Sequence, residues 1–172
     1  MAKRVLMLGT FDSKGEEYSF LRDRIIENGC EVASINAGVD GSTELFPVDV
    51  EADAVAAAGG DSLASLRAKR DRGNAMTVMN AGAAVLVRKM FDEGKFDGII
   101  GMGGSGGTGI VTSAMRNLPV GVPKFCVSTL AAGDISPFVG TKDIVMMPSI
   151  ADVSGINRIS RTILSRAAGA IC

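Results

Sequence analysis

Short apolar runs alternate along the chain with segments of helical periodicity. Residues 5–8 form a continuous apolar run that ends at Gly9, which is typical of a strand buried on both faces. Apolar residues then recur at helical spacing between residues 21 and 26, and this pattern stops at Asn28-Gly29. Residues 32–35 form a second short apolar run. This order predicts a strand–helix–strand unit of ordinary length.

The same alternation continues to the end of the sequence. It favours an α/β fold, a three-layer Rossmann-like domain with a mostly parallel sheet between helices. The length of 172 residues suits a single domain over 1–172. The later elements predicted are helices at 76–91, 110–117 and 156–170 and strands at 96–102, 124–128 and 144–147. In the last helix, Ile156, Ile159, Ile163 and Leu164 define the apolar face.

Two segments between the second strand and the helix at 76–91 lack a clear periodicity. Residues 36–53 form a long excursion with several acidic residues, interpretable as a functional segment or as a solvated loop. Residues 62–72 are basic and read as a charged helix or an exposed connection. Their side chains could bind phosphate, although a solvated face is the commoner outcome. The four basic residues are Arg67, Lys69, Arg70 and Arg72.

Composition limits the partners and the compartment. Hydrophobic residues make up 47% and charged residues 22%, with a net charge of −1, so no global field favours nucleic acid or an anionic membrane. No apolar run reaches the roughly 18 residues of a membrane-spanning helix. The first apolar run is also too short for a signal peptide. We therefore expect a cytoplasmic protein without nucleic-acid or membrane partners.

The sequence contains no histidine, which excludes Ser-His-Asp and Cys-His catalysis within the chain. Cys30, Cys126 and Cys172 match no metal-binding spacing and no disulfide framework. We expect no metal site and three reduced thiols.

Gly103 to Gly109 is the strongest local signal for a ligand. Five of these seven residues are glycine, and the other two carry hydroxyl groups. Glycine lets backbone N–H groups approach a ligand closely, and the helix expected at 110–117 would direct its positive end to the same point. The segment follows a predicted strand, where anions bind in such sheets. The candidate phosphate-binding residues are Gly103, Gly104, Ser105, Gly106, Gly107 and Thr108.

The glycine spacing does not identify the class of ligand. Gly101, Gly103 and Gly106 fit a dinucleotide fingerprint, but this match carries little weight in a stretch so rich in glycine. The lysine of a P-loop is absent. A tight strand–helix turn without a ligand is the structural alternative.

A second polar segment follows the first predicted strand, at the same sheet edge. Thr10, Ser13 and Lys14 can donate to phosphate, and Asp12 can hold a ribose hydroxyl or a metal-bound water. The alternative is that Asp12 or Ser13 only caps the following helix. The candidates taken from this segment are Gly9, Thr10, Phe11, Asp12 and Lys14.

A third polar segment ends the strand expected at 124–128. Ser128 and Thr129 close this strand and should also face the ligand edge. Asp152, Ser154 and Asn157 follow the fifth strand.

Several motifs in order give the chain a family resemblance. They are Gly-Thr-x-Asp-x-Lys at 9–14, Gly-Gly-Ser-Gly-Gly-Thr at 103–108, Ser128-Thr129, Gly140-Thr141 and Asp152-Val153-x-Gly155-Ile156-Asn157. The sequence resembles the N-terminal domain of the uncharacterised bacterial and plant family that includes the tomato mosaic virus resistance protein, an ATP-binding family. The resemblance implies that this chain is the N-terminal half of a longer two-domain protein. It also implies ATP binding and self-association.

We therefore expect an ATP-binding domain, with ATP bound alone or with magnesium, that forms a homo-oligomer. Two alternatives stay open. One is an enzyme acting on a phosphorylated or carboxylated metabolite, with Asp12, Lys14 or Asp152 as acid–base groups. The other is a structural half-domain that assembles with a partner.

Overall fold

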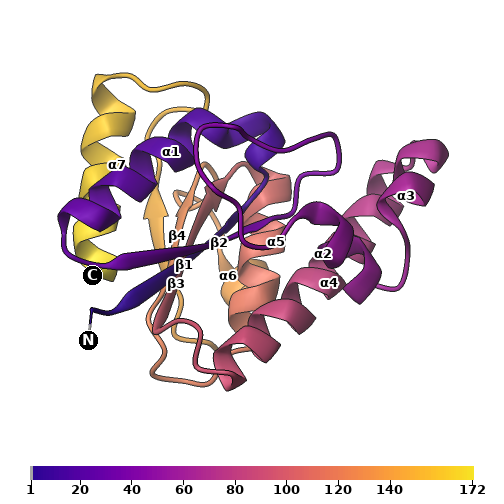
Figure 1. Cartoon of the computed structure of the whole chain (residues 1–172). Helices are drawn as coiled ribbons and strands as arrows, with labels where there is room; N and C mark the ends of the chain where they lie inside the picture. The colour runs from indigo at the N-terminus through magenta and orange to yellow at the C-terminus, as the bar shows by residue number, and fades with distance from the viewer. Residues whose placement is uncertain (1) are drawn as a thin grey trace.

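The computed structural model describes residues 2–172 and is built on a five-stranded sheet (Figure 1). All four strand pairs are parallel, and the strand order is β2-β1-β3-β4-β5. The predicted α/β class and the parallel sheet are thus confirmed. The strands are β1 (Arg4–Gly9), β2 (Glu31–Asn36), β3 (Gly98–Gly103), β4 (Lys124–Ser128) and β5 (Val145–Pro148).

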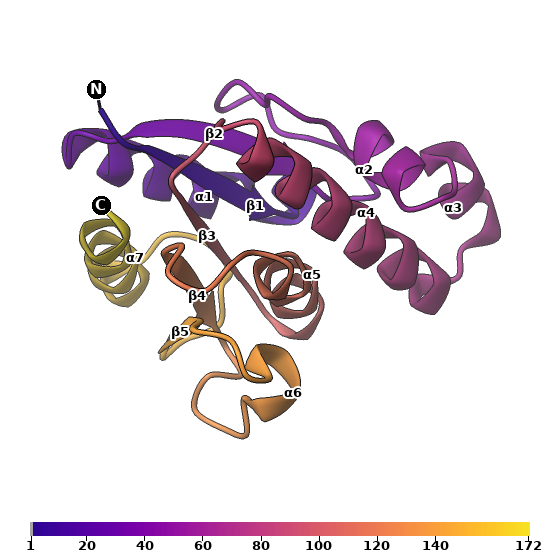
Figure 2. The ribbon, with the colours of Figure 1, turned by 90° about the horizontal axis from the view of Figure 1, so that it is seen from below.

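Helices cover both faces of the sheet, giving three layers (Figure 2). One face packs against α1 (Phe11–Glu27) and α7 (Arg158–Ile171). The other packs against α2 (Ala52–Ala58), α4 (Arg72–Asp92) and α5 (Ser105–Arg116). Of the two short helices, α3 (Leu63–Lys69) lies next to α2 and adds Leu63 and Leu66 to the same core cluster, and α6 (Ser136–Val139) lies next to α5.

Both sheet faces are apolar because both are covered. Leu6 and Ile99 pack in the cluster formed with α4 and α5, whereas Met7 and Ile100 pack in the cluster formed with α1 and α7. All four side chains are fully buried. This explains why the strands read as continuous apolar runs rather than as alternating patterns.

The last helix differs from its sequence prediction. It begins at Arg158 because Asn157 is its N-cap, with an Oδ1 that accepts hydrogen bonds from the backbone N–H groups of Ile159 and Ser160. The predicted apolar face was only partly correct, since Ile159 is 45% exposed. The face that is buried against the sheet consists of Leu164, Ala167, Ala168 and Ile171.

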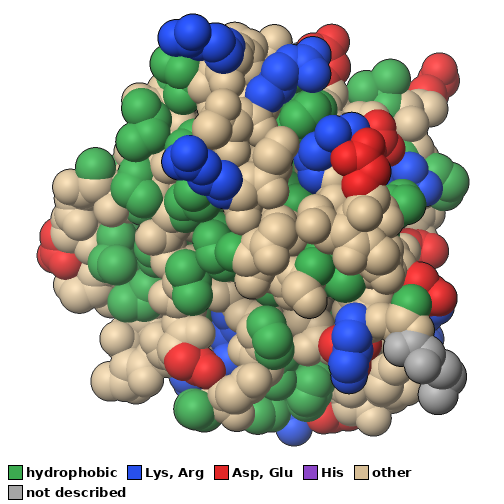
Figure 3. All heavy atoms as spheres, turned by 90° about the vertical axis from the view of Figure 1, so that its left-hand side faces the viewer, with side chains coloured by type: hydrophobic (Ala, Val, Ile, Leu, Met, Phe, Trp, Pro, Cys, Tyr) green, Lys and Arg blue, Asp and Glu red, His purple; other side chains and the backbone are tan. Residues whose placement is uncertain are grey.

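Some large apolar side chains stay exposed, among them Val145 on the edge strand β5 and Ile150 just after it. Ile150 also has a backbone φ of 67°, a left-handed conformation that is rare for a β-branched residue. Figure 3 shows apolar side chains grouped on one half of the face on the α7 side. The expected self-association stays a prediction.

Between residues 2 and 172, no helix is both long and apolar enough to cross a membrane.

Candidate functional site

The strand order places a crevice at the carboxyl ends of β1 and β3. From β1 the chain turns into α1 on one face of the sheet, and from β3 it turns into α5 on the other face. Because the two connections leave on opposite faces, they separate at this point of the sheet edge. In open parallel sheets this is where ligands bind, and the order 2-1-3-4-5 has its switch point between these two strands.

The glycine-rich segment is shorter as a loop than the sequence predicted. Gly103 is the last residue of β3, Gly104 is the N-cap of α5, and the helix begins at Ser105 rather than at Ile110. The backbone N–H of Thr108 already donates to the carbonyl of Gly104. The predicted seven-residue loop is therefore wrong in extent, and most of it is the first turn of the helix.

Two of these glycines are explained by packing alone. A Cβ atom on Gly103 would lie 2.9 Å from the Cα of Gly107, and one on Gly107 would lie 3.0 Å from the carbonyl oxygen of Met102. Glycine at both positions lets the first turn of α5 rest directly on the end of its strand. No glycine between 103 and 109 has a positive φ, so close approach and not an unusual turn is what requires glycine here.

Gly104 and Gly106 have no such explanation. A Cβ atom on Gly104 would meet only the hydroxyl of Thr129, at 3.7 Å. The atoms nearest to a Cβ atom on Gly106 would be the sulfur and methyl of Met76 at 3.6 and 3.7 Å and the guanidinium of Arg72 at 3.8 Å, which are ordinary contacts with flexible side chains. Because the fold tolerates a side chain at these two positions, their glycines leave free space at the positive end of α5.

A pocket of about 830 Å³ lies beside this helix end. Its size is within the range of small-molecule sites. The starts of α1 and α4, the loop after β2, and α3 with the residue following it contribute to its wall. From α5 only Ile110 lines it, so the glycine-rich segment adjoins the pocket without forming its wall. Apolar lining comes from Ala37, Val39, Leu66, Ala75, Met76 and Ile110, and polar lining from Thr10, Asp12, Ser13, Asp40, Arg67, Arg70, Asp71 and Arg72.

The three arginines of the pocket differ in how they are held. Arg67 donates from Nε to the carbonyl of Val39 at 2.6 Å and so anchors the loop after β2. Arg70 and Arg72 make no hydrogen bond or ion pair with any part of the chain that the structure describes. The basic run at 62–72 thus contributes two unpaired guanidinium groups to the pocket. Lys69 instead forms an ion pair with Asp61.

Asn36, at the carboxyl end of β2, joins two segments that line the pocket. Its fully buried side chain accepts hydrogen bonds from the backbone N–H groups of Phe11 and Gly38. Its amide group donates to the carbonyl of Gly41 and to Glu51. One side chain therefore fixes the start of α1 and the loop after β2 together. The sequence marks this residue only as the first of an irregular segment, so its role was missed.

Asp12 lies between the start of α1 and the loop after β2. Its Oδ2 accepts a hydrogen bond from the backbone N–H of Asp40 at 3.0 Å, whereas its Oδ1 is buried without a partner. The carboxylate rests against Gly38, where a Cβ atom would lie 2.4 Å from it. Asp12 is thus a pocket residue, and it does not cap α1, whose N-cap is Thr10.

Two predicted ligand residues of the first motif serve the core instead. Phe11 is buried and contacts the rings of Tyr18 and Phe46, with ring centroids 4.8 and 5.1 Å apart. Gly9 lies over the Tyr18 ring. The Tyr18 hydroxyl donates to the carbonyl of Leu8 and accepts from the backbone N–H of Met102, so it bridges β1 and β3 where they separate. Burial raises the pKa of this hydroxyl well above its usual range.

The hydroxyl groups of Thr108 and Ser128 are also used within the fold. Both side chains are fully buried, and their oxygens are 2.7 Å apart in a shared hydrogen bond. They join α5 to the end of β4 and do not face the pocket. Thr129 is half-buried beside Gly104. Lys14 lies at a kink in α1 and has no partner among residues 2–172.

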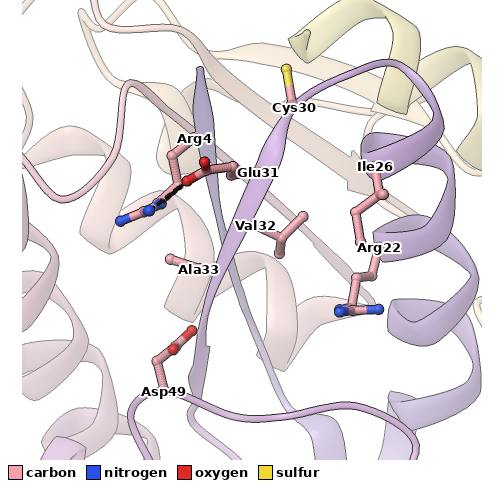
Figure 4. A pocket seen from close by; sticks show the side chains of 8 residues that line it. All are labelled: Arg4, Arg22, Ile26, Cys30, Glu31, Val32, Ala33 and Asp49. Atoms are coloured by element: carbon pink, nitrogen blue, oxygen red, sulfur yellow. Dashed lines mark hydrogen bonds and ion pairs between the residues drawn. The ribbon is translucent and has the colours of Figure 1, made fainter. Parts of the chain in front are cut away.

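A second hollow, of about 470 Å³, lies on the free edge of β2 (Figure 4). Arg4 forms an ion pair with Glu31 there, while Val32, Ile26 and Arg22 lie on the other side of the strand. The side chains therefore point to opposite sheet faces and do not converge. We take the crevice between β1 and β3, with the pocket beside it, as the candidate functional site.

The fold and this crevice define a doubly wound α/β domain with a candidate site at its switch point. Residues 3–172 match the model of the "Uncharacterised protein family (UPF0261) N-terminal domain", and the chain belongs to this family. A UPF0261 protein of Clostridium tetani is 49% identical over 171 residues, which cover 99% of the chain and 42% of that relative.

The relatives also include plant proteins. The ToMV susceptible protein tm-1(GCR26) of Solanum lycopersicum is 35% identical over 181 residues, covering 97% of the chain and 24% of that relative. The ToMV resistance protein Tm-1(GCR237) of the same plant is 34% identical over 181 residues, with the same coverage. The chain therefore spans less than half the length of these relatives.

Proposed function

We infer that the chain binds a nucleotide, with ATP as the first candidate, at the N-terminus of α5 and in the pocket beside it. The observation that carries this proposal is the free space at Gly104 and Gly106, which the packing of the fold does not require. A phosphate there would meet backbone N–H groups and the positive end of a 12-residue helix.

The pocket suits the rest of such a ligand. Its apolar wall, including Val39 and Met76, offers a surface for a base, and Thr10 and Asp12 offer polar groups for a sugar or a magnesium-bound water. Thr129 lies close enough to Gly104 to help with the phosphates. In this arrangement the buried hydroxyl groups of Thr108 and Ser128 do not contact the ligand. Their hydrogen bond holds the first turn of α5 against the end of β4.

Thermal unfolding with ATP, ADP and GTP, each with and without magnesium, tests the proposal. A ligand at 100 times its dissociation constant should stabilise the fold by about 2.7 kcal/mol. A substitution of Gly106→Val should remove this gain, because its side chain would occupy the phosphate space. The proposal fails if all three nucleotides leave the unfolding temperature of the unaltered chain unchanged.

Gly109→Val is the matched control. It places the same β-branched residue in the same helix, where a Cβ atom would meet nothing within 4 Å. Its helix-propensity cost is the same in kind, so it should lower stability similarly while keeping the stabilisation by ATP. Equal loss of ATP stabilisation in both variants would contradict the assignment to Gly106.

A further inference from the structure

The corner between α3 and α4 brings a pair of arginines to the candidate site. Only Arg70 and Asp71 separate the two helices. Arg70 has a φ of 50°, a strained left-handed conformation for a residue with a side chain, and Asp71 caps α4 by accepting from the backbone N–H of Asn74. The corner thus fixes the backbone positions from which the Arg70 and Arg72 side chains reach the pocket wall.

Arg72 is the arginine nearest to the proposed phosphate position. Its guanidinium lies 3.8 Å from the point where a Cβ atom of Gly106 would be. An anion in the free space at Gly106 would therefore contact both the N-terminus of α5 and this guanidinium. Charge-assisted hydrogen bonds from arginine to phosphate are among the strongest in proteins.

The acidic groups of the pocket leave Arg70 and Arg72 available. Asp12, Asp40 and Asp71 also line the pocket, but no ion pair joins them to either arginine in the described part of the chain. The Asp71 carboxylate is engaged as the cap of α4, and that of Asp12 accepts from the backbone N–H of Asp40. Among the arginines that line the pocket, Arg70 and Arg72 are the two whose guanidinium groups have no partner in the described residues.

We propose that the α3–α4 corner selects for polyphosphates: Arg72, assisted by Arg70, binds the terminal phosphates of a nucleoside di- or triphosphate bound at α5. This rests on the proposed nucleotide binding and adds to it a specificity that backbone N–H groups alone do not supply. A nucleoside monophosphate offers the corner only the one phosphate that the helix end also binds, whereas a di- or triphosphate offers it further charged oxygens.

Calorimetric titration of the whole chain with ATP, ADP and AMP tests this specificity. The unaltered chain should bind ATP and ADP more tightly than AMP. In Arg72→Gln we expect ATP affinity to fall about tenfold or more, the effect of one lost charged hydrogen bond, while AMP affinity falls by a clearly smaller factor. Arg88→Gln is the control, because Arg88 lies on the same helix and forms an ion pair with Asp92 away from the pocket.

The outcomes separate the two proposals. If Arg72→Gln weakens ATP and AMP equally, or changes neither, the selective role of the corner is refuted while nucleotide binding stands. If the unaltered chain binds none of the three nucleotides, both proposals fall. An unfolding temperature of Arg72→Gln close to that of Arg88→Gln shows that a change in affinity is not a loss of fold. Calorimetric titration with inorganic triphosphate tests the corner without a nucleoside. Binding heat measured with the unaltered chain but not with Arg72→Gln supports the corner as a phosphate site.

Discussion

The ring of Tyr18 fills the space directly beside Gly9. A Cβ atom on residue 9 would lie 2.0 Å from the tyrosine hydroxyl oxygen and 2.2 Å from the ring carbon that bears it. The side chain at position 18 therefore determines that position 9 is glycine. The first motif of the site begins with a residue that the core requires.

Gly9→Ala should consequently destabilise the fold by about 1–3 kcal/mol, the usual cost of overpacking a core. In a Tyr18→Leu background the added methyl group meets no phenol ring, so the same substitution should cost at least about 1 kcal/mol less. Urea unfolding of the four proteins of this cycle measures the difference. Equal costs in both backgrounds would show that the ring does not determine the glycine.

Tyr18→Phe tests the bridge between β1 and β3. It leaves the buried backbone N–H of Met102 without the oxygen that accepts its hydrogen bond at 2.8 Å. We expect a loss of about 1–3 kcal/mol in the free energy of unfolding, the cost of an unsatisfied buried donor. Amide hydrogen exchange should show faster exchange at Met102 in the variant. Unchanged protection at Met102 would argue against the bridge.

The ion pair of Lys124 and Asp143 predicts acid sensitivity. The buried ammonium group donates to Asp143 Oδ1 at 2.7 Å, and this bond lowers the pKa of the carboxyl to about 2. Because the folded pKa lies below the unfolded value of about 3.9, the pair stabilises the fold above about pH 4. Its contribution is lost as the pH falls from about 4 toward 2.

Asp143→Asn removes this titration while keeping a side chain of similar size. The free energy of unfolding of the variant should be lower than that of the unaltered chain at neutral pH, and the difference should shrink on acidification below about pH 4. Chemical unfolding at a series of pH values gives both curves. A difference that stays constant down to about pH 2 would contradict the assigned role of the pair.

Much of the fold was predictable from the sequence because the strands are buried on both faces. Runs such as residues 5–8 and 32–35 show this directly. The start of α5 was not predictable, since it depends on the contact of Gly107 with Met102 and not on helix propensity, which glycine lowers. Local sequence contains no signal for a contact of this kind.

The residues of the candidate site also fall into those that the sequence could place and those that it could not. Polar residues that follow strands, such as Thr10, Asp12 and Thr129, were placed at the correct sheet edge by topology alone. Whether a hydroxyl after a strand stays partly exposed or is buried within the fold depends on side-chain packing, which is why Thr108 and Ser128 were indistinguishable from Thr129 in the sequence. The arginines were visible as a charge run, but only the corner between two helices brings them to the pocket.

The glycines at the end of β3 are of two kinds, tightly packed and unpacked, and the two kinds should vary differently among members of the family. Gly103 and Gly107 are needed to seat α5 on its strand, so a relative that has lost every ligand should still keep them. Gly104 and Gly106 are not under that constraint. A search for the whole glycine run would therefore retrieve proteins that share the architecture. Under the proposed function, Gly104 and Gly106, rather than Gly103 and Gly107, would separate relatives that bind the ligand from those that serve as scaffolds.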